Sequence, residues 1–318
     1  MQRAVALVVG ALAVVCGTQA QADYVIVSWH QGRTFRVNET TGAITHEWFL
    51  PDGGGANNIA RSPVTGEVWV TSYQNGRADR LYRLDPLKGF APEYVQLNVE
   101  NVRALAFDGE GVLYAAVHVT NTYHRTIHVV NSANGHCQQI AQINSTPLQG
   151  MTFMPDGSVL GVSVNGSVGT SALHRIQRST WSVAQQVPVT QTPMYLQDVG
   201  LRPDGTAIVV GSGSPANTGD TVWTVNTSTG VLGPFTPGVT YAGDYRGIAW
   251  VPPPPPPCGS SDYNGDGDAA TDQDIEAFFA CMGGHCCEGC LVDFNGDGDD
   301  ATDQDIEAFF RVIGGGTC

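Results

Sequence analysis

Short apolar runs alternate with polar turns along residues 23–251, and the pattern repeats about every 46 residues. Each repeat holds two apolar runs around a turn that contains a glycine. These turn glycines are Gly66, Gly111, Gly157 and Gly205. Four short strands in about 40 to 50 residues are typical of one blade of a β-propeller. The pattern therefore predicts a mainly β domain over residues 23–251.

A third strand candidate follows each pair of apolar runs. These candidates are residues 34–37, 81–84, 127–130, 173–176 and 222–225. A fifth repeat begins at Arg246 and stops at a proline run, so it supplies only an innermost strand, 247–251. The run 24–29 lacks an innermost partner, and pairing it with 247–251 would close the ring and hide the sheet edges. We therefore predict a five-bladed propeller completed by its N-terminal strand; a β-sandwich and a six-bladed ring are the alternatives.

Residues 1–22 have the pattern of a secretory signal peptide, with Arg3, an apolar run over 4–15 and small residues before Asp23. The run is too short to span a bilayer, and no later run is long enough. We expect a secreted protein, extracellular or attached to the cell surface. A membrane anchor and a lipoprotein modified at Cys16 are the alternatives. The proline run 252–257 predicts an extended spacer behind the propeller.

The net charge of −15 is concentrated behind this spacer. From Cys258 onward, 14 acidic residues stand against Arg311 alone, which gives −13, whereas the preceding part has 16 acidic and 14 basic residues, which gives −2. A local excess of carboxylates is typical of cation ligation. The chain has no basic region of the kind that binds nucleic acid.

Six of the eight cysteines lie in the same tail: Cys258, Cys281, Cys286, Cys287, Cys290 and Cys318. In an exported chain they predict as many as three disulfides, whose connectivity does not follow from spacing. A zinc site formed by His285 with Cys286, Cys287 and Cys290 is the alternative. Cys137 lies apart, and we expect a free thiol on a strand.

Two nearly identical stretches, 262–279 and 293–310, lie 31 residues apart in the tail. Each places oxygen-bearing side chains at alternate positions with glycine at the sixth, the pattern of a calcium loop. Position twelve is glutamine in both, so we assign the closing carboxylate to position thirteen. The predicted ligands of two Ca²⁺ ions are Asp262, Asn264, Asp266, Asp274, Asp293, Asn295, Asp297 and Asp305, with Asp268 and Asp299 ligating through their backbone carbonyls. Two acidic loops without metal are the alternative.

Residues 258–318 resemble type I dockerin domains, in the cysteine-bearing variant found at the C-termini of exported bacterial proteins. Two copies of Asp-x-Asn-x-Asp-Gly and of the helix start Asp-Ile-Glu-Ala-Phe-Phe carry the resemblance, which covers about a fifth of the chain. It implies an α-helical, EF-hand-like module that folds with calcium and binds a cohesin-like partner in two orientations. The positions that contact the partner in this family correspond to Thr271, Asp272, Thr302 and Asp303. A role as a surface-sorting tail is the alternative.

Propeller ligands bind where the loops that enter the innermost strands converge. The aligned residues there are Asn58, Arg103, Gln149, Gln197 and Arg246. None is a carboxylate, which favours a non-catalytic module that binds a glycan or protein over an enzyme. A purely structural surface protein without a channel ligand is a further alternative.

The main alternative is a glycoside hydrolase for polysaccharide degradation, which needs a pair of carboxylates. Asp198 and Asp244, with Asp23 or Glu67 as a third, are the candidates. Three histidines, His118, His124 and His128, are close in sequence, and we interpret them as solvated side chains and not as metal ligands.

Overall fold

The computed structural model describes residues 23–74, 76–144, 146–165, 170–189, 194–213, 221–234, 244–252, 259–286, 292–297 and 299–316. The predicted signal peptide and residues 253–257 of the proline spacer lie outside these ranges. The chain divides into two compact units, Met1–Pro252 and Pro253–Cys318. No helix in the described part of the chain is long and apolar enough to cross a membrane.

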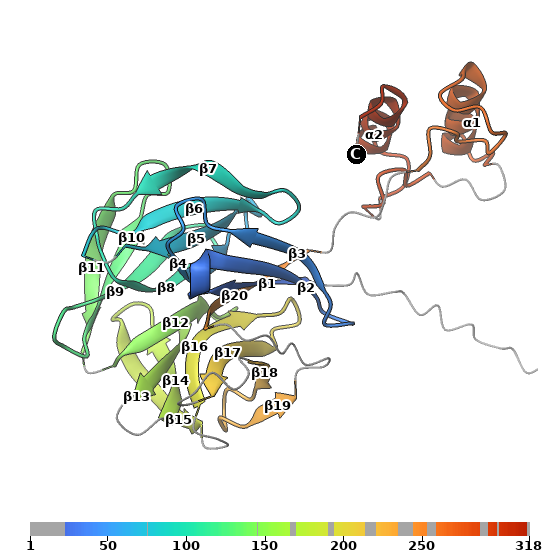
Figure 1. Ribbon diagram of the computed structural model, residues 1–318. Coiled ribbons are helices and arrows are strands. Elements are labelled where there is room, and N and C mark those ends of the chain that lie inside the picture. The colour runs from blue at the N-terminus through green and yellow to red at the C-terminus, as the bar shows by residue number, and fades with distance from the viewer. Residues whose placement is uncertain are drawn as a thin grey trace, which may run out of the picture. The chain divides into compact units, whose positions relative to one another are not determined.

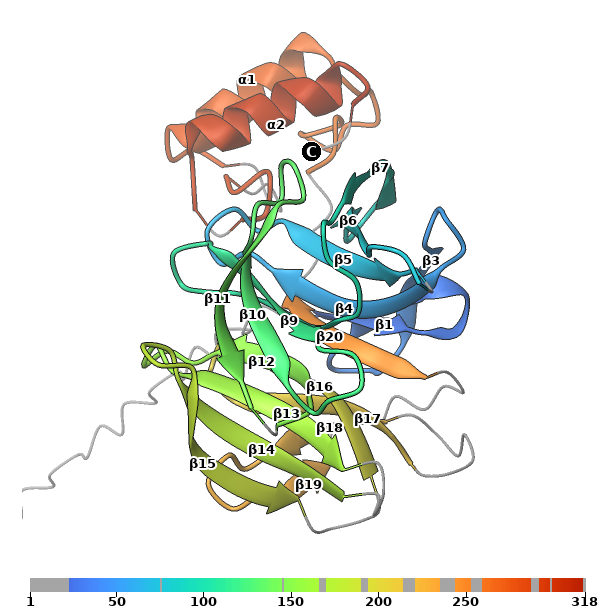
Figure 2. The ribbon, with the colours of Figure 1, turned by 90° about the vertical axis from the view of Figure 1, so that its left-hand side faces the viewer.

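The first unit consists of five antiparallel sheets, each with four strands (Figures 1 and 2). Blade 1 contains β4 (Gly55–Arg61), β5 (Val68–Tyr73), β6 (Arg80–Asp85) and β7 (Gly89–Gln96). Blade 2 contains β8 (Val102–Phe107), β9 (Leu113–His118), β10 (Arg125–Val130) and β11 (Cys137–Ile143). Blade 3 contains β12 (Leu148–Phe153), β13 (Val159–Asn165), β14 (Thr170–Gln177) and β15 (Ser182–Val189). Blade 4 contains β16 (Met194–Leu201), β17 (Ala207–Gly213), β18 (Thr221–Val225) and β19 (Leu232–Pro234).

Blade 5 joins the two ends of the propeller sequence. Its strands are β20 (Tyr245–Val251), β1 (Asp23–Ser28), β2 (Arg33–Asn38) and β3 (Ile44–Phe49), with the short 3-10 helix η1 (His30–Gly32) between β1 and β2. Strand β1 pairs with β20 from Asp23 opposite Val251 to Val27 opposite Gly247. The predicted five-bladed propeller and its closure by the N-terminal strand are therefore confirmed.

The buried side chain of Arg36 stabilises the pairing of the N-terminal and C-terminal strands of the propeller. The Arg36 side chain is 1% exposed, and its Nε donates to Asp23 Oδ2 at 2.6 Å. Its Nη1 and Nη2 donate to the carbonyl oxygens of Pro86 (2.8 Å) and Pro252 (2.9 Å). Because a buried charge is costly unless it is paired and hydrogen-bonded, this arrangement holds the first and last strands together.

The hydrophobic core lies between neighbouring blades. Five buried clusters each combine side chains from two adjacent sheets, as in the contact of Ile26 and Phe35 of blade 5 with Ile208 and Val210 of blade 4. Trp48, Trp69, Trp181, Trp223 and Trp250 belong to these clusters, one to each. Packing of facing sheets explains these tryptophans, four of which lie on strands and one, Trp181, in the turn between β14 and β15.

The second unit contains two helices, α1 (Asp272–Met282) and α2 (Asp303–Ile313), with identical starts. Thr271 and Thr302 are the N-caps, and each forms a capping box with the aspartate three residues later. The Phe278 and Phe309 rings stack at 4.0 Å between centroids, and Tyr263 and Phe294 complete the same buried cluster. The two copies thus pack their equivalent aromatic side chains against each other.

Candidate functional site

Each innermost strand of the propeller has one β-bulge near its N-terminal end. The extra residues at the five bulges are Asn57, Arg103, Gln149, Gln197 and Arg246. A bulge leaves one residue out of the strand pairing and redirects its side chain. Four of these five positions are residues that the sequence placed at the channel mouth.

Blade 1 differs from the predicted alignment by one residue. The bulged residue is Asn57, whereas Asn58 pairs regularly with Thr71. The predicted alignment matched the turn glycines, but the turn between β4 and β5 is one residue longer than the turn between β8 and β9. Both asparagines are buried, and Asn58 Nδ2 donates to the Val102 carbonyl at 3.2 Å. Asn58 therefore contributes to the contact between blades 1 and 2.

The other four predicted residues line one cavity of about 310 Å³. Its walls are formed by Arg103, His118, Thr122, Tyr123, Arg125, Pro147, Gln149, Val164, Gln197 and Arg246. Arg125 and His118 were not predicted for this site, because they lie on β10 and β9 and not on an innermost strand. The sequence feature that could have identified Arg125 is its position just before the predicted third strand at 127–130.

Three guanidinium groups share this cavity. Burial and the nearby Arg246 lower the pKa of Arg103, and burial followed by Arg103 lowers the pKa of Arg125 to about 10. Burial, Arg125 and Arg103 also lower the pKa of His118, which favours a neutral ring that accepts from Arg125 Nη1 at 2.8 Å. The cavity is therefore strongly positive.

Arg246 is held more firmly than Arg103. Its Nη2 donates to Asp244 Oδ2 at 2.5 Å, Nη1 donates to Gln197 Oε1 at 3.3 Å, and its guanidinium lies 5.2 Å from the centre of the Trp29 ring. Within the described ranges, the Arg103 guanidinium makes no hydrogen bond. Of the three cations of the cavity, only Arg246 therefore has a carboxylate partner among the described residues, whereas Arg103 and Arg125 have none.

Side chains from the third-strand region of three blades fix the cavity wall. Asp79 Oδ2 accepts from Val102 N at 2.7 Å, Arg125 Nε donates to Leu148 O at 2.8 Å, and Ser171 Oγ accepts from Leu196 N at 3.0 Å. Val102, Leu148 and Leu196 directly precede bulged residues. These hydrogen bonds between blades therefore set the backbone from which the cavity side chains project.

The opposite ends of the innermost strands line a second cavity, of about 440 Å³. Each blade contributes apolar side chains, among them Ile59, Leu105, Met151, Val199 and Ile248. The basic residues predicted for the channel therefore lie at one end only, that of the strand N-termini.

The four candidate catalytic carboxylates do not all lie together. Asp23 pairs with the last residue of β20, whereas Asp244 precedes the first, so about 20 Å of strand separates them. Asp198 accepts from Ile248 N at 3.0 Å, and burial raises the pKa of its carboxyl well above the usual range. Glu67 Oε1 lies 3.4 Å from Arg83 Nη1, with which it forms an ion pair. A glycoside hydrolase needs two carboxyl groups facing one bond.

Side-chain oxygens of the first tail loop accept hydrogen bonds from the backbone of the same loop. Asp262 Oδ2 accepts from Gly267 N at 3.1 Å, Asn264 Oδ1 from Asp266 N at 2.9 Å, and Asp266 Oδ1 from Asp268 N at 2.9 Å. Asp262 Oδ1 is buried without a hydrogen-bond partner. The second loop repeats two of these bonds, from Asp297 N to Asn295 Oδ1 and from Asp299 N to Asp297 Oδ1.

Such a set of oxygen ligands fits a hard cation such as Ca²⁺. Each oxygen that accepts a backbone hydrogen bond keeps a second lone pair with which it can ligate the ion. In the parts of the chain that the structure describes, no group of three or more His, Cys, Asp or Glu side chains converges on a metal position. Asn264 and backbone carbonyls, which belong to the predicted ligand set, are of other types.

Asp274 and Asp305 have a different environment from the other predicted ligands. Asp274 Oδ1 accepts from Tyr263 N and Asn264 N, and Oδ2 accepts from Thr271 N and Thr271 Oγ1. Asp305 makes the same four bonds in the second copy. All lone pairs of these carboxylates are in use. The closing-ligand role stays a prediction that requires some of these bonds to be exchanged.

Of the predicted partner contacts, Asp272 and Asp303 are exposed, whereas the hydroxyls of Thr271 and Thr302 are used in the helix caps. The structure adds two exposed aromatic rings. Phe279 is 45% and Phe310 46% exposed, and their ring centres lie 6.2 Å apart. The Phe-Phe pair in each copy was the available signal, because adjacent residues of a helix face different directions.

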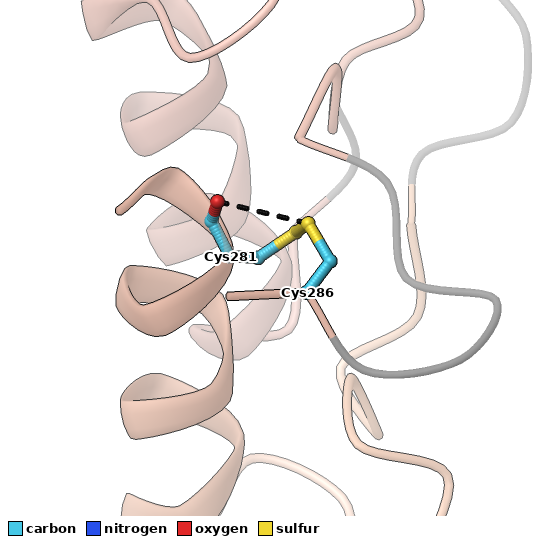
Figure 3. The surroundings of a disulfide bond; sticks show 2 residues. All are labelled: Cys281 and Cys286. Carbon is cyan, nitrogen blue, oxygen red and sulfur yellow. Dashed lines mark hydrogen bonds between the residues drawn. A yellow bond between two sulfur atoms is a disulfide. The ribbon is translucent and has the colours of Figure 1, made fainter. Parts of the chain in front are cut away.

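Among the described cysteines, one disulfide, Cys281–Cys286, joins the last turn of α1 to the residues that follow the helix (Figure 3). The predicted zinc alternative loses a thiolate, because Cys286 is oxidised. The other predicted disulfide partners, Cys258, Cys287, Cys290 and Cys318, lie outside the described residues. Cys137 is free and buried, and burial raises the pKa of its thiol to about 11.

No protein-family model matches the chain, and no curated protein matches its sequence. Among solved structures, a protein of unknown function from Bacteroides caccae is 10% identical, with a TM-score of 0.43 over 73% of this chain and 99% of that one. TolB from Acinetobacter baumannii is 13% identical, with a TM-score of 0.43 over 74% and 67%. The PQQ-bound aldose sugar dehydrogenase from Streptomyces coelicolor is 16% identical, with a TM-score of 0.41 over 63% and 89%. Nothing about function follows from likenesses this low.

Proposed function

We propose that this chain is an exported, non-catalytic binding module whose propeller holds a ligand and whose dockerin-like tail attaches it, with Ca²⁺, to a cohesin-like partner or a cell surface. The observation that supports binding most directly is the convergence of Arg103, Gln149, Gln197 and Arg246 on one cavity. These side chains donate and accept hydrogen bonds, and no carboxylate is among the described residues that line the cavity.

Attachment is supported by the two matching tail copies. Both copies have a capping box, and in both loops side-chain oxygens accept hydrogen bonds from the loop backbone. These hydrogen bonds hold the loop in a curved conformation that suits a hard cation. The paired Phe279 and Phe310 rings and the exposed Asp272 and Asp303 would form the surface that contacts a partner.

Attachment is tested by binding of the full chain to an immobilised type I cohesin in Ca²⁺ and in chelator. We expect binding in Ca²⁺ alone, and its loss in the double variant Asp262→Ala, Asp293→Ala. Calcium binding without cohesin binding would favour the surface-sorting role, and no response to calcium would contradict the attachment proposal.

The non-catalytic role is tested by incubating the chain with soluble polysaccharides and measuring new reducing ends. We expect none above the level of a boiled sample. Release of reducing ends that depends on Asp198 or Asp244 would support the glycoside hydrolase instead.

A further inference from the structure

We infer that the cavity around Arg103, Arg125 and Arg246 binds a small oxyanion with two negative charges, carried by two carboxylates or by a phosphate. This inference rests on the proposed binding role of the propeller and gives its ligand a chemical class. It begins with charge balance. Three guanidinium groups line the cavity. Among the residues that the structure describes, its walls include no acidic side chain, and the one carboxylate bound to these cations is Asp244, on Arg246.

Buried cations at close range are disfavoured, and burial first, then a neighbouring guanidinium group, lowers the pKa values of Arg103 and Arg125. Two positive charges remain after Asp244 is counted. A dianion would neutralise them, and charge-assisted hydrogen bonds to carboxylate or phosphate are among the strongest that a guanidinium makes.

Hydrogen-bond donors are also left over. The Arg103 guanidinium makes no hydrogen bond in the described part of the chain, and Arg246 Nε is buried without a partner. By contrast, Arg125 already donates through Nε to Leu148 O and through Nη1 to His118 Nδ1 and His124 O. Arg125 therefore holds the wall in place, while Arg103 is available to a ligand.

The donors are fixed before a ligand arrives. The bulge and the Asp79–Val102 hydrogen bond set the backbone at Arg103, and Trp29, Asp244 and Gln197 restrain Arg246. Preorganised donors reduce the entropy lost on binding. A volume of about 310 Å³ suits a small molecule, and Tyr123, 68% exposed, marks the side open to solvent.

The test is calorimetric titration of the full chain at low ionic strength with three probes: succinate, inorganic phosphate and the neutral disaccharide cellobiose. We expect succinate or phosphate to bind at one site, and higher salt to weaken binding. Which of the two binds distinguishes a carboxylate ligand from a phosphate ligand.

Variants make the test specific to the cavity. Arg103→Met should weaken anion binding at least tenfold without lowering the thermal midpoint of the free propeller, because it removes a repelling charge and no protein hydrogen bond. Arg103→Lys should retain more of the affinity. Arg61→Met, at the other channel cavity, is the matched control and should bind as the wild type.

Failure of both anions to bind, or equal binding by Arg103→Met and the wild type, would overturn the inference. Binding of cellobiose that is indifferent to Arg103→Met would also overturn it, yet leave the propeller a binding module. Calcium-dependent attachment through the tail is measured separately and is unaffected by either result.

Discussion

The five propeller blades and the two tail copies are both built from sequence repeats, but they differ in what the repeats preserve. The blades keep their strand pattern and a bulge at the same place, while the bulged residue changes among Asn57, Arg103, Gln149, Gln197 and Arg246. The tail copies keep all but one of the polar side chains of the loop and helix start, including the hydrogen bonds of Asp274 and Asp305. Because the bulged residues differ from blade to blade, the propeller has one asymmetric cavity. Because the two tail copies are nearly identical in sequence, their loops are equivalent.

Equal substitutions in the two tail copies should therefore have equal effects. Phe278→Ala and Phe309→Ala each remove half of the stacked pair and should lower the free energy of unfolding of the tail by about 3 to 5 kcal/mol. Helical circular dichroism follows the tail during denaturant unfolding, since all six tryptophans lie in the propeller and their fluorescence follows that unit. Phe279→Ala and Phe310→Ala are the exposed controls, with losses below about 1 kcal/mol. A marked difference between Phe278→Ala and Phe309→Ala would contradict the equivalence.

Equivalent positions of the propeller should instead differ in their response to pH. Burial raises the pKa of Asp79 to about 6 from its ordinary 3.8, so the folded state binds this proton more tightly than the unfolded state does. Its contribution to stability is therefore complete below about pH 4 and falls by about 3 kcal/mol as pH rises through 6.

Asp79→Asn should remove this pH dependence from tryptophan-detected unfolding, measured between pH 4 and 7. Ser171→Ala, which breaks the corresponding hydrogen bond of blade 3, should leave it unchanged. An identical pH profile for the wild type and Asp79→Asn would contradict the assignment.

Loss of one calcium loop should have the same effect whichever copy is changed. At a Ca²⁺ concentration one hundred times Kd, one site stabilises the folded state by about 2.7 kcal/mol. Asp262→Ala and Asp293→Ala should each remove that amount from the tail and leave the tryptophan transition of the propeller in place. Gln273→Ala and Gln304→Ala, on the exposed first turn of each helix, are the controls and should retain the calcium effect.

The smallest effect expected is at the helix caps. Thr271→Ala and Thr302→Ala each remove the hydroxyl of a capping box and should cost about 1 kcal/mol of tail stability. Thr271→Ser and Thr302→Ser keep the hydroxyl and should cost less, as denaturant unfolding followed by circular dichroism would show. Unequal costs for the two alanine variants would break the equivalence of the copies.

The sequence predicted the blade number and the closing strand because hydrophobic alternation and turn glycines recur at a regular spacing, and a half repeat at each end requires the two ends to pair. The predicted alignment of blade 1 was wrong by one residue, Asn58 in place of Asn57. A bulge and a longer turn shift the strand register without changing the pattern of apolar residues and turn glycines.

The cavity was only partly predictable. Arg103, Gln149, Gln197 and Arg246 share an aligned position, whereas Arg125 enters from a third strand, and no single repeat reveals which strands face the same space. The hydrogen bonds of Asp274 could not be predicted either, because a carboxylate at that position is compatible with both a calcium ligand and a capping box.

Calorimetric titration of Ca²⁺ into the full chain tests the central claim, that the nearly identical tail copies form two equivalent calcium sites, in contrast to the single asymmetric cavity of the propeller. The account predicts two sites of equal affinity in the wild type, one in Asp262→Ala, one in Asp293→Ala and none in the double variant. Absence of calcium binding in the wild type, or binding that survives in the double variant, would contradict it.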